Sequence, residues 1–96
     1  MNRWNVDYQY KGITHLMKLN ILSVLGDAID KYGQSDKYQI ASVVREWLED
    51  CYGKNWRVTI GEIGTWQSAG PVFEDRYLGI TETNLRWFIT IFQQTP

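Results

Sequence analysis

The chain changes its hydrophobic period within a few residues, and this change constrains the fold more than any other feature. Apolar residues recur at helical spacing from residue 40 to residue 51; they are Ile40, Val43, Val44, Trp47, Leu48 and Cys51. Gly53 is well placed to end this helix in a left-handed conformation. From Trp56 to Ile60 apolar and polar residues alternate, which predicts a half-buried strand. A helix therefore leads directly into a sheet.

Two segments precede this helix. Residues 4–13 roughly alternate between aromatic or apolar and polar side chains, so we expect a strand that ends at Gly12. Apolar residues then recur at helical steps from His15 to Tyr32, and Thr14 can cap that helix. Gly26 inside it costs about 1 kcal/mol relative to alanine. We therefore expect tertiary packing or a close neighbour at that position.

Three segments follow the alternating strand from Trp56 to Ile60. Residues Gly61 to Gln67 are predicted to form a second short strand that leaves at an angle, because paired glycines permit a bulge or a sharp bend. Val72 to Ile80 and Leu85 to Gln94 are predicted strands, joined by a loop at residues 81–84. This order predicts an α+β fold, with an N-terminal strand and two helices packed on an antiparallel sheet.

Size and composition indicate one ordinary globular domain that spans residues 1–96. Aromatic residues make up 15% of the chain, with five Trp and six Tyr, which is a large share for so small a core. We expect some of these rings at an interface with another chain, because aromatic side chains are favoured there. The alternative is a core that is merely rich in rings.

Several functional classes are disfavoured by charge and hydropathy. A net charge of −1 gives no electrostatic basis for binding nucleic acid. No apolar run approaches the roughly 20 residues that span a bilayer, and the N-terminus lacks the apolar core of a signal peptide. We therefore expect an intracellular, cytosolic protein without a membrane partner. The single cysteine, Cys51, is expected to be a small buried hydrophobe of its helix.

Residues with catalytic potential are few and do not combine. His15 is the only histidine and has no predicted partner for a zinc site or an activated nucleophile. Glu74, Asp75 and Glu82 are expected to be charges on the solvent side. The glycines at 61 and 64 lack the lysine and the following helix of a phosphate loop. We predict no enzyme activity, and no catalytic, metal or cofactor site.

The remaining candidate is the edge of the sheet. A short strand flanked by Gly61 and Gly64 presents unpaired backbone groups, and a strand from another chain could cover them. Trp66 is the natural anchor residue at such an edge. The alternative is that Trp66 packs onto the core of its own chain.

Several stretches resemble the small dimeric dynein light chains of the hub type. They are residues 28–32, residues 40–53, the strand from Trp56 to Gly61, and Ile63-Gly64-Thr65-Trp66, while Tyr77-Leu78-Gly79 and residues 88–92 match in kind. The resemblance implies a homodimer in which the strand after Gly61 crosses to the sheet of the other subunit. Each of two grooves at the dimer interface then accepts an extended peptide as an added strand, here a segment of a dynein intermediate chain.

The resemblance also implies a set of groove and dimer-edge residues. They are Lys37, Gln39, Ile63, Gly64, Thr65, Trp66, Gln67, Phe73, Tyr77, Phe88 and Thr90. The implied location is the cytoplasm and its cytoskeleton. The sequence departs from the family at two places, Glu74-Asp75-Arg76 and a longer hairpin at residues 81–85. These departures suggest a specialised relative in the dynein arm of a ciliary axoneme. Its dimer partner would then be a different light chain. A Tctex-type light chain and a small ligand-binding or enzymatic α+β domain remain as alternatives.

Overall fold

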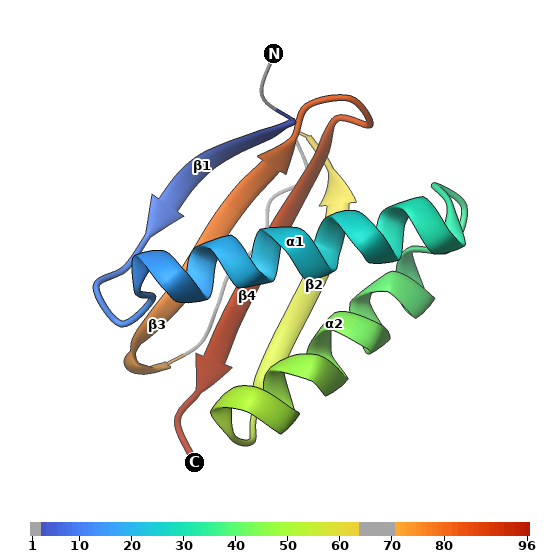
Figure 1. Cartoon of the computed structure of the whole chain (residues 1–96). Coiled ribbons are helices and arrows are strands. Elements are labelled where there is room, and N and C mark those ends of the chain that lie inside the picture. Colours follow the sequence, from blue (N-terminus) through green and yellow to red (C-terminus); the bar gives the residue numbers. More distant parts are fainter. Residues whose placement is uncertain (1–2, 64–70) are drawn as a thin grey trace.

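Four antiparallel strands form one sheet, and two helices cover one of its faces (Figure 1). The computed structural model describes residues 3–63 and 71–96. The elements in chain order are β1 Trp4–Gln9, α1 His15–Tyr32, α2 Lys37–Tyr52, β2 Trp56–Glu62, β3 Val72–Glu82 and β4 Trp87–Gln94. The strand order is β1-β3-β4-β2, so β1 and β2 are the two edges of the described sheet. The predicted α+β class is confirmed.

Helix α1 begins as its sequence predicts. The side chain of Thr14 accepts a hydrogen bond from the backbone N–H of Met17 at 3.1 Å. At Gly26 a Cβ atom would lie 3.3 Å from Nη1 of Arg3 and 3.8 Å from the ring of Trp4. The close neighbour expected at this glycine is therefore Arg3, which lies 23 positions earlier in the chain.

Helix α2 also follows the predicted stripe. Ile40, Val44 and Leu48 are fully buried beneath it, and Gly53 ends it with a φ of 97°. The expectation that Cys51 is buried was wrong, because its side chain is exposed. Cys51 lies in the last turn of α2, one turn beyond the last fully buried residue of the stripe.

The core lies between the helices and the sheet. Alternate residues of the two central strands, including Leu78, Ile80, Ile89 and Ile91, are fully buried. In β2 the predicted alternation is confirmed, since Trp56 is fully buried while Arg57 and Thr59 are exposed. Burial of these apolar side chains supplies most of the stabilisation of the sheet.

Three element boundaries differ from the sequence-based prediction. The first strand ends at Gln9 instead of Gly12, and β3 continues to Glu82, so that the turn to β4 spans residues 83–86. Glu82 is only 1% exposed, which corrects its assignment as a solvent-side charge. Of the short strand predicted from Gly61 to Gln67, the first two residues belong to β2, and residues 64–67 lie outside the described residues.

Strand β3 contains an irregularity that the sequence did not predict. Between the pairs Val72↔Gln94 and Tyr77↔Phe92, β3 advances five residues while β4 advances two. Glu74 and Asp75 lie within this bulge and both have positive φ, of 52° and 55°. Both are exposed, as expected, but the bulge has displaced them from regular strand geometry.

Candidate partner-binding edge and helix-free face

Strand β2 has a regular and open outer edge. Among the described residues its only neighbour is β4, with seven consecutive pairs from Trp56↔Gln93 to Glu62↔Trp87 and no register shift. Beyond each end of this ladder, the N–H of Gln94 donates to the carbonyl of Asn55 at 2.9 Å, and the N–H of Ile63 donates to the carbonyl of Arg86 at 3.0 Å. These two bonds establish which residues of β2 face β4.

Hydrogen-bonded pairs alternate along an antiparallel ladder. Because Asn55 and Ile63 are bonded to the chain of β4, the odd-numbered residues between them face β4 as well. The backbone groups of the even-numbered residues, Trp56, Val58, Ile60 and Glu62, therefore point to the outer edge. A strand laid along β2 would bond to these four residues.

The face of the sheet opposite α1 and α2 has no helix on it among the described residues (Figure 1). We call it the helix-free face. A row of rings crosses it, with centroids 5.0 Å apart for Tyr10 and Tyr77 and 6.0 Å apart for Tyr77 and Phe92. Tyr10 is 46% exposed, so the row begins at the surface of the molecule.

Gly79 lies at the centre of the helix-free face. A Cβ atom there would be 3.0 Å from Cδ2 of Tyr8 and 3.5 Å from ring atoms of Tyr77 and of Phe88. The absence of a side chain at Gly79 thus lets three rings come together over the strand. Burial, and to a smaller extent the neighbouring phenols of Tyr10 and Tyr8, raise the pKa of Tyr77 above its ordinary value of 10.0.

The structure brings together three of the predicted site residues. Tyr77, Phe88 and Thr90 share the helix-free face, where the hydroxyls of Thr90 and Thr59 form a short contact across β4 and β2. Phe73 is half-buried in the bulged part of β3, away from this row.

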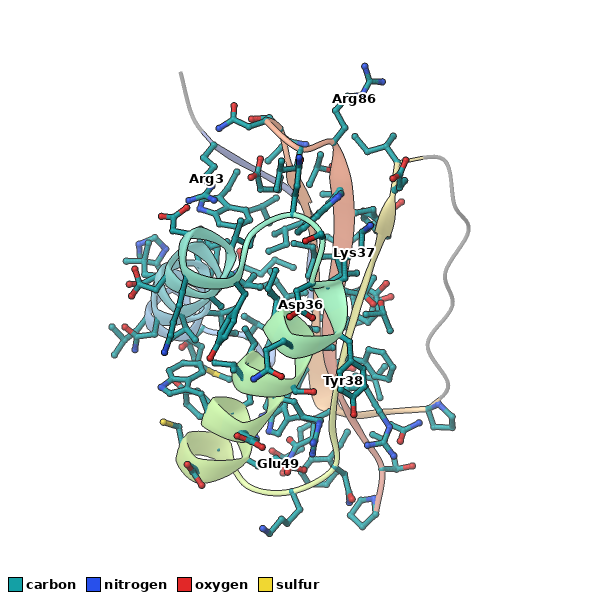
Figure 2. The ribbon with its side chains drawn as sticks, turned by 90° about the vertical axis from the view of Figure 1, so that its right-hand side faces the viewer. Arg3, Asp36, Lys37, Tyr38, Glu49 and Arg86 are labelled. Carbon is teal, nitrogen blue, oxygen red and sulfur yellow. The ribbon has the colours of Figure 1, made fainter. Side chains whose placement is uncertain are left out.

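Other predicted site residues lie at the far end of β2 or on the helix side. Ile63 follows β2 and is 47% exposed. Lys37, at the start of α2, places its Nζ 5.1 Å from the ring centroid of Trp87, and Figure 2 shows it beside Asp36 and Tyr38. Gln39 is half-buried in the same helical turn. The predicted residues Gly64, Thr65, Trp66 and Gln67 lie outside the described residues.

Sequence reasoning missed the contribution of β1 to the helix-free face. Tyr8 and Tyr10 contact the rings of β3, although their alternation with Trp4 and Val6 placed all four on one side. The pairing of β1 with β3 shifts register between Val6 and Tyr8, and this bulge moves the later rings to the other face. The alternation of rings therefore predicted a strand, but it did not predict on which face of the sheet each ring lies.

Groups suited to chemistry do not converge in the part of the chain that the structure describes. Residues 3–63 and 71–96 contain no group of three His, Cys, Asp or Glu side chains that could hold a metal ion. A cavity of about 170 Å³ between α1 and α2 is lined by Val24, Asp27, Ala28, Lys31, Tyr32 and Val43. Its lining contains one tyrosine, Tyr32, and no tryptophan. No described helix is long and apolar enough to cross a membrane.

Comparison with known proteins identifies the fold. No family model and no curated protein matches the sequence. The dynein light chain-like domain of the Fasciola hepatica calcium-binding protein FhCaBP2, solved as a mercury derivative, matches with a TM-score of 0.79 and 11% identity, over 100% of this chain and 95% of that chain. Its native crystal form matches with a TM-score of 0.76 and 11% identity, over 97% and 91%. The chain therefore has a divergent dynein light chain-like fold, which confirms the predicted resemblance.

Proposed function

We propose that this protein is a non-catalytic light-chain subunit of a dynein motor complex. It forms a dimer and binds extended segments of dynein intermediate chains by adding them as strands to its sheet. The observation that carries the proposal is the outer edge of β2, an uninterrupted strand with four residues whose backbone groups point away from β4. Added strands gain affinity from such main-chain groups and selectivity from the side chains around them.

The helix-free face supports the dimeric part of the proposal. Its rings, Tyr8, Tyr10, Tyr77, Phe88 and Phe92, extend from the exposed tyrosines at β1 to β4, the strand that neighbours the open edge of β2. Aromatic residues are enriched where protein surfaces are buried against each other. The second chain is either an identical copy or a different light chain. In both cases the strand after Gly61 crosses to pair with the outer edge of β2 in the other subunit, and the intermediate-chain segment adds to the remaining free side of that crossed strand.

A dimer would hold two intermediate-chain segments side by side. Each segment then binds at a high effective concentration once the other is bound, which strengthens the assembly without new contacts. The cytoplasm and its cytoskeleton, including the axoneme of a cilium, are the proposed locations. The dynein light chain-like fold supports this role, and the bulge at Glu74 and Asp75 leads us to expect a peptide preference that differs from the usual one.

The proposal is tested by the solution mass of the protein, alone and with synthetic segments of dynein intermediate chains. Light scattering is expected to give a dimer, and a larger complex with two bound segments. Trp66→Asp is expected to lose the dimer or the bound segments. The matched control is Leu19→Asp, which changes an equally apolar side chain, 48% exposed on α1, far from β2 in the sequence.

A monomer that binds no intermediate-chain segment at any concentration would contradict the proposal. So would a dimer that Leu19→Asp disrupts as strongly as Trp66→Asp does, because the association would then not depend on the predicted edge.

A further inference from the structure

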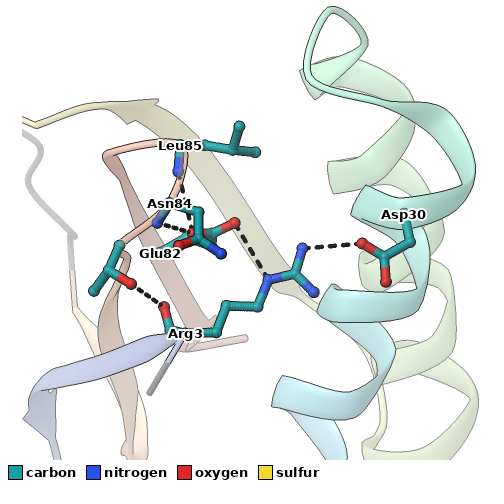
Figure 3. Close-up of polar contacts among 6 residues, drawn as sticks. Arg3, Asp30, Glu82, Asn84 and Leu85 are labelled. Carbon is teal, nitrogen blue, oxygen red and sulfur yellow. Dashed lines mark hydrogen bonds and ion pairs between the residues drawn. The ribbon is translucent and has the colours of Figure 1, made fainter. Parts of the chain in front are cut away.

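A buried carboxylate organises the turn between β3 and β4. Glu82 is 1% exposed, and its oxygens accept hydrogen bonds from the backbone N–H groups of Asn84 at 2.5 Å and Leu85 at 3.2 Å (Figure 3). Nε of Arg3 donates to the same carboxylate at 3.3 Å. A buried charge is tolerated only where such partners compensate for its lost hydration. The turn and the N-terminal strand therefore share one buried group.

Arg3 connects this turn to a helix as well. Its Nη2 lies 3.1 Å from Oδ1 of Asp30 on α1 (Figure 3), and its Nη1 lies against the bare backbone of Gly26. Its carbonyl accepts from the backbone N–H of Thr83 at 2.8 Å and from the hydroxyl of Thr83 at 3.0 Å. One residue at the start of β1 thus contacts both α1 and the turn.

The far end of the same turn holds the end of β2. The carbonyl of Arg86 accepts the hydrogen bond from Ile63, the residue directly after β2. The contact involves only the backbone carbonyl of Arg86, since its side chain points away from the protein (Figure 2). The backbone of Arg86 has a φ of 60°. The turn at residues 83–86 is therefore hydrogen-bonded to the residue at which the chain leaves β2.

We propose that Arg3 is a positioning residue for the partner-binding edge, acting through Glu82 and the turn on Ile63. Attachment of the N-terminal strand then regulates partner binding at the end of β2. This inference rests on the function proposed above. Loss of Arg3 leaves the buried Glu82 carboxylate without a cation. The turn at residues 83–86 then changes conformation so that water can reach the carboxylate. As a result the backbone at Ile63, which is hydrogen-bonded to this turn, changes position.

The test uses the full chain and the variant Arg3→Met, which keeps a long unbranched side chain beside Gly26. Amide exchange measured by NMR is expected to be about tenfold faster at Ile63, Asn84 and Leu85, and changed by less than about twofold at Ile89 and Ile91 in the core. The dimer dissociation constant is expected to rise about tenfold. Arg45→Met, which breaks a 3.1 Å pair with Glu49 on α2, is the matched control and is expected to change neither quantity.

A second variant separates the lost arginine from the uncompensated charge. In Arg3→Met/Glu82→Gln the buried carboxylate is absent, while a side-chain oxygen remains to accept from Asn84 and Leu85. Exchange at Ile63 is expected to return to within about threefold of the wild-type rate, so the effects of the two substitutions are not additive. Since this variant buries no net charge, it also keeps the test valid if Arg3→Met unfolds.

Three results would overturn the inference. The first is an equal acceleration of all slowly exchanging amides, which indicates a contribution to global stability alone. The second is exchange at Ile63 that stays unchanged while Asn84 and Leu85 accelerate. The third is a wild-type dimer whose dissociation constant is the same in Arg3→Met. A wild type that is monomeric throughout contradicts the proposed function itself and the regulation with it.

Discussion

The two edges of the sheet are built differently. Strand β1 pairs with β3 through a register shift between Val6 and Tyr8, and its exposed Asp7 accepts hydrogen bonds from Asn5 and Thr81, both at 2.7 Å. Strand β2 pairs with β4 without any shift along its whole length. Both edges carry exposed charges, Asp7 on β1 and Arg57 and Glu62 on β2, but only β1 contains a bulge, whereas β2 is regular.

This difference indicates which edge is available to another chain. Proteins protect edge strands with bulges, charges and short lengths, because a straight edge invites pairing with a further strand. Strand β1 has a bulge and an exposed charge, and Arg3, directly before it, forms ion pairs with Glu82 and Asp30. Strand β2 shows neither a bulge nor a side-chain clamp of this kind among the described contacts. This difference supports the proposal that β2, and not β1, is the edge to which a partner binds.

The largest expected effect is a difference in unfolding free energy between variants that remove the tryptophan of each edge strand. Each edge strand begins with a tryptophan on the helix side, but Trp56 is fully buried while Trp4 is half-buried. Trp56→Ala is expected to lower the free energy of unfolding by about 3–5 kcal/mol. Trp4→Ala is expected to lower it by about 1–3 kcal/mol. Urea denaturation of both variants measures the difference, and equal losses would contradict the unequal anchoring.

The protected edge can be disturbed by itself at Gly12. A Cβ atom there would clash with the carbonyl oxygen of Glu74, so the backbone at Gly12, just after β1, or the backbone of the β3 bulge must move. Gly12→Ala is expected to cost about 1–3 kcal/mol of unfolding free energy and to leave the dimer dissociation constant unchanged. The neighbouring Lys11→Ala removes only an exposed ion pair with Asp75 and is the control. Weaker dimerisation of Gly12→Ala would show that the far end of β1, and not Arg3 at its start alone, influences the edge of β2.

Two adjacent proline substitutions test the open edge. Gly61→Pro removes an N–H that faces β4 and is expected to cost about 1–3 kcal/mol of unfolding free energy. Glu62→Pro removes an N–H at the outer edge, where the side chain is exposed, and is expected to change the unfolding free energy by less than about 1 kcal/mol. It should nevertheless raise the dimer dissociation constant about tenfold. If Glu62→Pro dimerises like the wild type, strand addition does not involve this end of β2.

The smallest expected effect is the loss of stability at alkaline pH that is due to Tyr77, whose ring contacts Tyr10 on the helix-free face. Because the pKa of Tyr77 is raised above 10.0 in the folded state, the neutral phenol contributes stability that is complete below that pH. This contribution is lost as the pH rises above 10 and through the folded-state pKa. Urea denaturation at about pH 9 and about pH 11 should therefore show a loss that is smaller in Tyr77→Phe than in the wild type. An equal loss in both would assign the alkaline sensitivity to other groups.

Local signals made most of the fold predictable. The stripe of α2, the cap at Thr14, the end at Gly53 and the alternation of β2 each depend on residues within one or two turns of the chain. Glu82 was misassigned because its burial depends on Arg3, which is 79 positions away in the sequence. The bulge at Glu74 likewise depends on Gly12, whose backbone lies against it only in the folded chain.

The part of the candidate site that lies on β3 and β4 was predictable, because alternation along a strand determines which residues share a face. Phe88 and Thr90 fall on one face because they are two positions apart on β4, and Tyr77 joins them because it pairs with Phe92, the next residue of that alternation. Tyr8 joins them only through the register shift in β1, which no local pattern indicates. The residues predicted from Gly64 to Gln67 stay predictions.

The central claim is that the outer edge of β2 receives a strand, and amide protection at that edge tests it most directly. The N–H groups of Val58 and Ile60 point outward, whereas that of Thr59 faces β4. Hydrogen–deuterium exchange should therefore slow about tenfold or more at Val58 and Ile60 when the protein dimerises, with little change at Thr59. Rapid exchange at Val58 and Ile60 in a partner-bound protein would contradict the account, because the partner would then bind elsewhere.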